Sequence, residues 1–125
     1  MLDHVGINVS DYDRSRDFYT HALAPLGYEL IMEPEPQIGG FGREGKPDFW
    51  IAEPRKPPTE NVHVAIVAAD RPSVDAFHAA ALEAGGTDNG GPGVREHYHP
   101  AYYGAFVLDP DGNNIEAVCH RPPGD

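Results

Sequence analysis

The apolar positions of this chain change their spacing in a fixed order. Residues 2–9 form a predicted strand, and apolar side chains then recur at helical spacing across residues 12–24, with Gly27 ending the helix. Further strands are predicted at 28–33, 39–43 and 48–52, of which the last two flank a turn at 44–47. The first half of the chain is therefore predicted to run strand, helix, then three strands.

The second half repeats this order. Residues 4–27 align with residues 63–86 at a constant offset of 59, and eight of the 24 aligned pairs are identical. A strand at 61–68 precedes a helix that starts near Asp70 and ends at Gly85 and Gly86, and strands at 103–108 and 114–118 flank a hairpin turn at 109–112. Residues 87–100 are rich in turn formers and remain ambiguous. The chain is a duplicated unit.

This duplication predicts an α+β fold made of two βαβββ modules. Eight strands would form a strongly curved mixed sheet with the helices on its convex side and a cleft on its concave side. We expect one domain over residues 1–125, with module 1 at about 1–53, a proline-rich linker at 54–60 and module 2 at about 61–120. Because each module is near the lower size limit for independent folding, the two should share a core.

Charge and composition exclude some classes of binding partner. Nine Lys and Arg against 20 Asp and Glu give a net charge of −11, which argues against binding to nucleic acid. No apolar run exceeds six residues, so no membrane span is predicted. Cys119 is the only cysteine, and the chain passes from Met1 almost directly into a strand without a signal-peptide pattern. A cytoplasmic protein is expected.

Two histidines hold matched positions in the repeat. His4 and His63 each open an apolar strand, and strand parity places both on the face opposite the helices. Glu116 lies in the last apolar strand, where burial is costly unless the carboxylate is paired or bound to a metal. Two histidines and a carboxylate can hold Fe, Mn, Ni or Zn with open coordination positions. The alternatives are hydrogen-bonded histidines and an exposed edge-strand glutamate.

The repeat also predicts what faces Glu116 in module 1. Aligning the hairpin glycines Gly45 and Gly112, with one extra residue in the first copy, pairs Trp50 with Glu116. A fourth ligand is then absent, and an aromatic wall is expected in its place. If the extra residue is misplaced in this alignment, Asp48 or Glu53 would lie nearer the site. Trp50, Phe49 and Tyr102 are the predicted walls of a substrate pocket.

A second dense group of polar and aromatic residues spans 96–103. Its members His97, His99 and Tyr103 are predicted catalytic residues, since histidine titrates near neutral pH and suits proton transfer. The alternative is a polar loop packed by its own aromatic side chains.

Three segments resemble the vicinal oxygen chelate superfamily of glyoxalases, bleomycin resistance proteins and extradiol dioxygenases. They are LDHVGINVSDYDRSRDFY at the start, HVAIVAADRPSVDAFH at the second copy and FVLDPDGNNIEAV near the end. The resemblance implies paired modules around a divalent metal, with His4, His63 and Glu116 as ligands, and a homodimer. Glyoxalase I has a second glutamate where this chain has Trp50, so the His/His/Glu set is closer to the dioxygenases and thiol transferases of the superfamily.

The expected function is a metal-dependent enzyme that chelates adjacent oxygens of a small substrate, as a lyase, dioxygenase or thiol transferase. The alternative is a metal-free binding or resistance protein that sequesters a small aromatic or antibiotic ligand. The sequence does not identify the substrate, nor does it decide whether the two modules of one cleft come from one chain or two.

Overall fold

The computed structural model describes residues 1–54 and 56–123, so Arg55 of the predicted linker and the last two residues of the predicted domain lie outside the described residues. The first module contains β1 (Val5–Asn8), α1 (Tyr12–Ala22), a short 3-10 helix η1 (Ala24–Leu26), β2 (Glu29–Glu35), β3 (Ile38–Arg43) and β4 (Lys46–Ala52). The second contains β5 (His63–Val67), α2 (Arg71–Glu83), β6 (Thr87–Val94), β7 (Tyr103–Leu108) and β8 (Asn114–Cys119).

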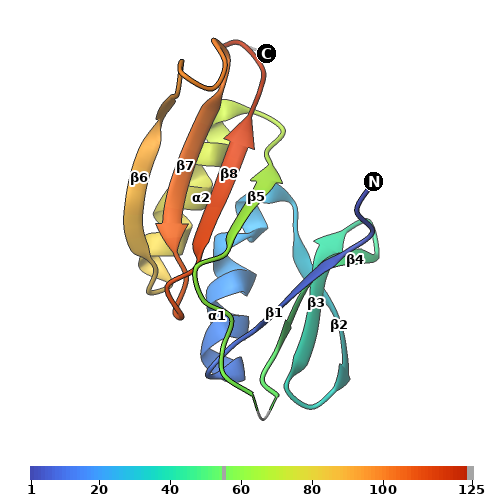
Figure 1. The fold of residues 1–125 in the computed structure, drawn as a ribbon. Helices are drawn as coiled ribbons and strands as arrows, with labels where there is room; N and C mark the ends of the chain where they lie inside the picture. The colour runs from blue at the N-terminus through green and yellow to red at the C-terminus, as the bar shows by residue number, and fades with distance from the viewer. Residues whose placement is uncertain (55, 124–125) are drawn as a thin grey trace.

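The two modules have the same topology (Figure 1). Each forms a four-stranded sheet, in the order β1-β4-β3-β2 or β5-β8-β7-β6, so the eight expected strands are divided between two sheets. The first strand of each module runs parallel to the fourth, whereas the other pairs are antiparallel. The predicted α+β fold with two βαβββ modules is confirmed.

Both helices begin at a capping aspartate that the repeat aligns. The Asp11 carboxylate accepts the amide of Arg14 at 3.2 Å, and the Asp70 carboxylate accepts the amide of Ser73 at 2.8 Å. Such bonds satisfy amides that the first helical turn leaves free, and the negative charge suits the positive end of the helix. The matched caps explain why both helices start at the predicted positions.

The ambiguous segment 87–100 contains strand β6. Its composition, TDNGGPGV, disfavours a strand, but pairing with β7 supplies backbone partners and the register shifts twice. Gly90 has φ 143°, a conformation that glycine adopts without strain, and it lies against Phe106. Tertiary pairing therefore determines a strand that local propensity does not favour.

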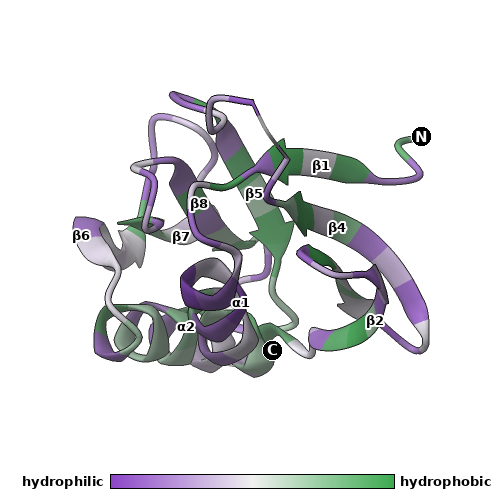
Figure 2. Ribbon diagram, turned by 90° about the horizontal axis from the view of Figure 1, so that it is seen from below, coloured by the Kyte–Doolittle hydropathy of each residue, from purple (hydrophilic) through white to green (hydrophobic). Residues whose placement is uncertain are grey.

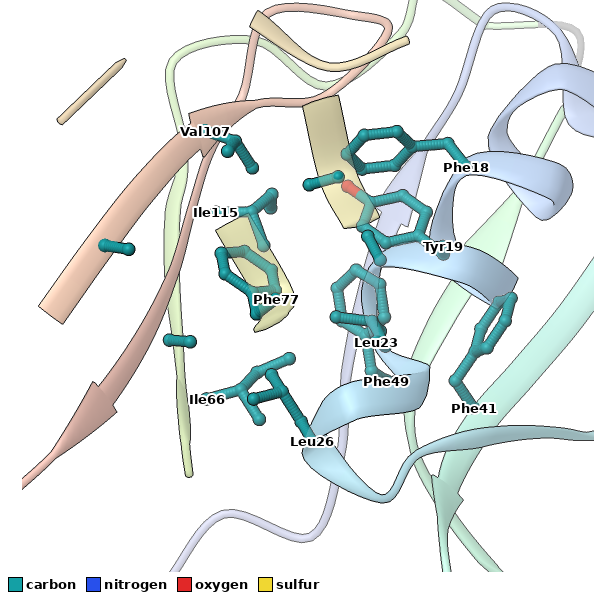
Figure 3. Close-up of a cluster of buried hydrophobic side chains, with 14 of the residues drawn as sticks. Phe18, Tyr19, Leu23, Leu26, Phe41, Phe49, Ile66, Phe77, Val107 and Ile115 are labelled. Atoms are coloured by element: carbon teal, nitrogen blue, oxygen red, sulfur yellow. The ribbon is translucent and has the colours of Figure 1, made fainter. Parts of the chain in front are cut away.

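The helices pack side by side on the same side of the sheets (Figure 2), and one core joins both modules. Phe18, Tyr19 and Phe49 of module 1 meet Phe77 and Ile115 of module 2 in this core (Figure 3). A shared core is the expected solution for modules of this size.

A buried hydrogen bond links α1 to the turn between β7 and β8. The Tyr19 hydroxyl donates to Asp109 Oδ2 at 2.5 Å, and both residues are almost fully buried. Burial, with the adjacent Asp109 carboxylate, raises the pKa of Tyr19 far above its usual value, so the phenol remains a donor. Asp109 Oδ1 accepts the amides of Asp111 and Asn113, which fixes the turn.

We expect Tyr19→Phe to lower the free energy of unfolding by about 1.5–3 kcal/mol, because a buried carboxylate loses one of its donors. Urea unfolding followed by circular dichroism measures this change. Tyr28→Phe, which removes a half-buried phenol bonded to Asp48 at 3.0 Å, is the control and should cost less. Equal losses for the two variants would show that the buried Tyr19–Asp109 bond stabilises the protein no more than the half-buried Tyr28–Asp48 bond does.

Candidate functional site

The strand registers show how the two modules correspond. Glu116 in β8 pairs with Ala65 in β5 and Phe106 in β7, whereas Trp50 in β4 pairs with Gly6 in β1 and Gly40 in β3. Gly6 and Ala65 are also partners in the sequence repeat. Trp50 therefore occupies the position in module 1 that Glu116 occupies in module 2, as the aligned hairpin glycines predict.

Glu116 is a buried carboxylate with two side-chain partners. Its side chain is 1% exposed, and its Oε1 lies 2.7 Å from Nε2 of His63 on the neighbouring strand β5. Its Oε2 accepts a hydrogen bond from the hydroxyl of Tyr102. Such partners offset the cost of burying the charge. Burial, together with the Glu116 carboxylate, raises the pKa of Tyr102 well above its usual value, so Tyr102 remains a donor.

A pocket of about 490 Å³ opens beside Glu116. We call it the histidine pocket; its lining residues are His63, Tyr98, His99, Tyr102, Glu116 and His120. It combines a carboxylate, three imidazoles and two phenols, which is the chemistry needed to hold a metal or a polar ring. His63 also lines a second cavity, so the two hollows meet at this residue.

The second hollow, the inter-sheet cavity, has a volume of about 430 Å³. Its walls come from the start of the chain, from β5 and from residues in and near β3 and β4, and they include both His4 and His63. The repeat thus brings its two histidines to one cavity. His4 is 59% exposed, and its Nδ1 lies 2.8 Å from the carboxylate of Asp3. Within residues 1–54 and 56–123, no three His, Cys, Asp or Glu side chains lie close enough together to hold a metal.

The structure separates the residues predicted for acid–base catalysis. His99 lines the histidine pocket, whereas His97 packs against Tyr98 outside its lining, with ring centroids 4.0 Å apart. Tyr103 turns to the helix side of the sheet, where its hydroxyl donates to Asp75 at 2.6 Å. Alternation along β7 explains the difference between Tyr102 and Tyr103, because adjacent side chains of a strand point to opposite faces.

The residues predicted to form the pocket walls also lie in different parts of the structure. Tyr102 lines the histidine pocket, whereas Phe49 is 2% exposed, belongs to the core and also lines the inter-sheet cavity. Trp50 lies over Gly40, where an added Cβ would stand 2.8 Å from the indole. Glycine at this position therefore allows the indole to lie flat against β3.

The tautomer of His99 follows from a local hydrogen bond. The backbone amide of Ala101 donates to His99 Nδ1 at 3.0 Å, so this nitrogen has no proton. The neutral ring then carries its proton on Nε2 and is a donor at that atom. His99 is thus better suited to donate to an oxygen of a bound molecule than to serve as a base through Nδ1.

His120 and Tyr98 belong to the pocket but were not predicted for it. The His120 ring meets Tyr102 edge-on with centroids 5.1 Å apart, and Tyr98 lies 5.0 Å from Tyr102. Strand parity was the available signal for His120, because it lies two residues beyond Val118 on the face of Glu116. For Tyr98 no comparable signal exists, since it lies in a turn.

Arg43 joins the two modules. Its Nε donates to the carbonyl of Leu26 at 2.9 Å, and its Nη2 donates to the carbonyl of Val67 in module 2 at 2.5 Å. Its guanidinium also lies 5.1 Å from the ring centroid of Tyr28. These contacts fix Arg43 at the edge of the inter-sheet cavity.

None of the helices in the described part of the chain combines the length and apolar character needed to cross a membrane.

Several solved structures with similar folds are named as glyoxalases, glyoxalase/bleomycin resistance proteins or related enzymes. A glyoxalase/bleomycin resistance protein from Albidiferax ferrireducens T118 is 32% identical with a TM-score of 0.80, and the match covers 95% of this chain and 97% of that one. A glyoxalase/bleomycin resistance protein/dioxygenase family enzyme from Burkholderia phytofirmans PsJN is 20% identical with a TM-score of 0.74, covering 96% and 98%. The latter likeness concerns the fold alone.

A glyoxalase-related enzyme from Fulvimarina pelagi also shares the fold, with 16% identity, a TM-score of 0.73 and coverage of 95% and 87%. No functionally curated protein matches this chain. The sequence profile of one superfamily matches residues 1–117, which is nearly the whole chain. With two βαβββ modules and this match, the protein belongs to the Glyoxalase/Bleomycin resistance protein/Dioxygenase superfamily.

Proposed function

We propose that this protein is a metal-dependent enzyme that binds a small substrate through two adjacent oxygens. The observation that carries the proposal is the pair of His63 and Glu116, which is built into neighbouring strands at the point where both hollows meet. A carboxylate that is 1% exposed and faces an accessible imidazole is an arrangement that suits a divalent cation.

The chemistry of this donor pair fits Fe, Mn, Ni or Zn. Two ligands about 2.1 Å from one ion stand roughly 3 Å apart when they subtend a right angle. Nε2 of His63 and Oε1 of Glu116 are 2.7 Å apart, so a small opening would admit an ion between them. These residues would hold the metal together with a third donor, and open positions would remain for substrate.

His4 is the proposed third donor, supplied by a second copy of the chain. In one chain His4 is bonded to Asp3 and belongs to no three-donor group among the described residues. β1, which directly follows His4, and β5, which begins at His63, each have one edge without a strand partner in the sheets described. Val5 and Val67 on these strands are 37% and 58% exposed. A homodimer that brings β1 of one copy to β5 of another would cover these residues and complete the ligand set.

The bound metal would supply a Lewis acid that stabilises negative charge developing on substrate oxygens. The protein's own residues would contact the Glu116 carboxylate and the bound substrate. Tyr102 donates to Oε2 of Glu116 in the same pocket. His99 presents an N–H donor from Nε2, and His120 stands beside Tyr102 in the same pocket. An imidazole at this place can donate a hydrogen bond to a bound molecule or accept one from it.

The reaction class follows from the ligand set. Trp50 replaces the carboxylate that would make a fourth ligand, and proton shuttling of the glyoxalase I kind needs that group. A dioxygenase or thiol transferase is therefore favoured over a lyase of that kind. The single cysteine is consistent with a cytoplasmic enzyme, since reducing compartments need no disulfides.

A metal-free binding protein is the second candidate. It is favoured by the Asp3 partner of His4 and by the aromatic lining of the histidine pocket. In this case Tyr98 and Tyr102 would form the walls for a small aromatic or antibiotic ligand, and Glu116 would bind a donor group on it.

Mixing two defective variants tests the proposed dimeric site. His4→Ala and Glu116→Ala homodimers should each bind no metal. When the two chains are coexpressed, about half of the dimers are mixed and each mixed dimer has one complete site, so metal content should return to about a quarter of the wild-type value. Metal analysis by mass spectrometry measures this recovery. No recovery in verified mixed dimers would mean that one copy does not supply His4 to the other.

A further inference from the structure

The Glu116 carboxylate accepts a hydrogen bond from Tyr102, and module 1 has no tyrosine at the matching position. The strand registers pair Trp50 with Gly40, and Glu116 with Phe106, so the third and fourth strands of the two modules correspond at an offset of 66. At this offset Tyr102 corresponds to Pro36 and Gly104 to Ile38. The phenol donor and the glycine beneath it therefore occur only in the module that carries the carboxylate.

We propose that Tyr102 is the positioning residue of this site: its hydroxyl holds Oε2 of Glu116 so that only Oε1, beside His63, is offered to a bound metal or ligand. The inference rests on the proposed function for the identity of the bound group. It assigns to Tyr102 a role distinct from a pocket wall, because the phenol acts through the carboxylate.

The backbone of Tyr102 is fixed on both sides. Its carbonyl accepts the amide of Arg95 at 2.7 Å, and its amide donates to the carbonyl of His99 at 3.0 Å. The ring is flanked by Tyr98 at 5.0 Å and His120 at 5.1 Å between centroids. A side chain held in this way can fix the group it contacts without moving when a ligand binds.

The space for this pair depends on Gly104. An added Cβ at Gly104 would lie 3.2 Å from Oε2 of Glu116 and 3.2 Å from Cε1 of Tyr102, closer than an ordinary contact. Gly104 is buried and pairs with Val118 on β8. Glycine at this position lets the phenol and the carboxylate approach each other over the sheet, so Gly104→Ala should push the pair apart while leaving both groups present.

The Tyr102 hydrogen bond limits how Glu116 can bind an ion. A carboxylate with one oxygen held by Tyr102 offers a single oxygen to an ion, in one direction set by the strand register. Residues that hold a metal ligand through a hydrogen bond typically affect metal affinity by 10- to 100-fold when removed. Tyr102 should act in this range.

The test compares Tyr102→Phe with Tyr12→Phe. Tyr12 also donates to a glutamate, Glu33, at 2.5 Å, but it lies in module 1 outside both hollows, so it controls for loss of a tyrosine–carboxylate bond. Competition with a chromophoric chelator measures affinity for Co²⁺ and Zn²⁺. We expect Tyr102→Phe to weaken binding about 10- to 100-fold, Gly104→Ala to weaken it less, and Tyr12→Phe to leave it unchanged.

Unchanged affinity in Tyr102→Phe, with a wild-type protein that binds metal, would overturn the positioning role and leave the metal proposal intact. A wild-type protein that binds no metal would instead overturn the proposed function. A crystal structure of metal-free Tyr102→Phe decides the inference in that case: a Glu116 side chain turned away from His63 supports it, and an unchanged carboxylate contradicts it.

Discussion

Glu116→Gln should weaken divalent metal binding by more than about 100-fold, beyond the 10- to 100-fold that loss of a supporting residue costs. The amide keeps the size of the side chain but removes its negative charge, which is the donor property that divalent ions require at this position. Chelator competition with Zn²⁺ and Co²⁺ measures the affinity of the variant and of the wild type.

The effect of Glu116→Gln should be confined to metal binding and should not extend to the fold. His21→Gln removes an imidazole on the exposed face of α1, where His21 Nδ1 lies 2.7 Å from the carbonyl of Asp17, and should leave metal affinity unaltered. Circular dichroism and thermal unfolding of both variants check that the fold is retained. A Glu116→Gln protein that binds metal as tightly as the wild type would remove Glu116 from the ligand set.

Phe77→Ala should cost about 3–5 kcal/mol of unfolding free energy and should destabilise both modules together. Phe77 lies on α2 with no exposed surface, in the core that contains Phe18 and Tyr19 of module 1 (Figure 3). Its removal leaves a cavity that neither module can fill alone. Because the core is shared, the variant should still unfold in one transition.

Urea unfolding followed by two signals measures this effect. Trp50 fluorescence reports on module 1, which does not contain the substitution, and far-ultraviolet circular dichroism reports on the whole chain. Leu82→Ala, on the same helix with 38% exposure, is the control and should cost far less. Loss of the circular dichroism signal at a lower urea concentration than the Trp50 transition would show that the modules fold separately.

The sequence predicts the fold well because the pattern occurs twice. Strand parity places His63 on the face opposite the buried Ile66, and the structure agrees, since side chains alternate along any strand. Asp11 and Asp70 mark the helix starts because short carboxylates satisfy free amides. Strand β6 is the exception, since its stability comes from pairing with β7 and not from its own residues.

The site is less predictable because it depends on contacts between elements. Alignment of the hairpin glycines predicts the correspondence of Trp50 and Glu116, because it depends on strand register alone. The Tyr102–Glu116 hydrogen bond joins residues 14 positions apart and depends on how the turn before β7 closes. The Asp3 partner of His4 and the pocket position of His120 likewise follow from local packing that periodicity does not encode.

The metal content of untagged wild-type protein tests the central claim most directly. We expect about one divalent ion per chain in a homodimer, since each copy contributes one His63–Glu116 pair and one His4. Mass spectrometry on protein purified without a histidine tag, with size-exclusion chromatography coupled to light scattering, measures both quantities. Metal-free protein that takes up no Fe, Mn, Ni or Zn on titration, yet binds a small aromatic ligand, would contradict it.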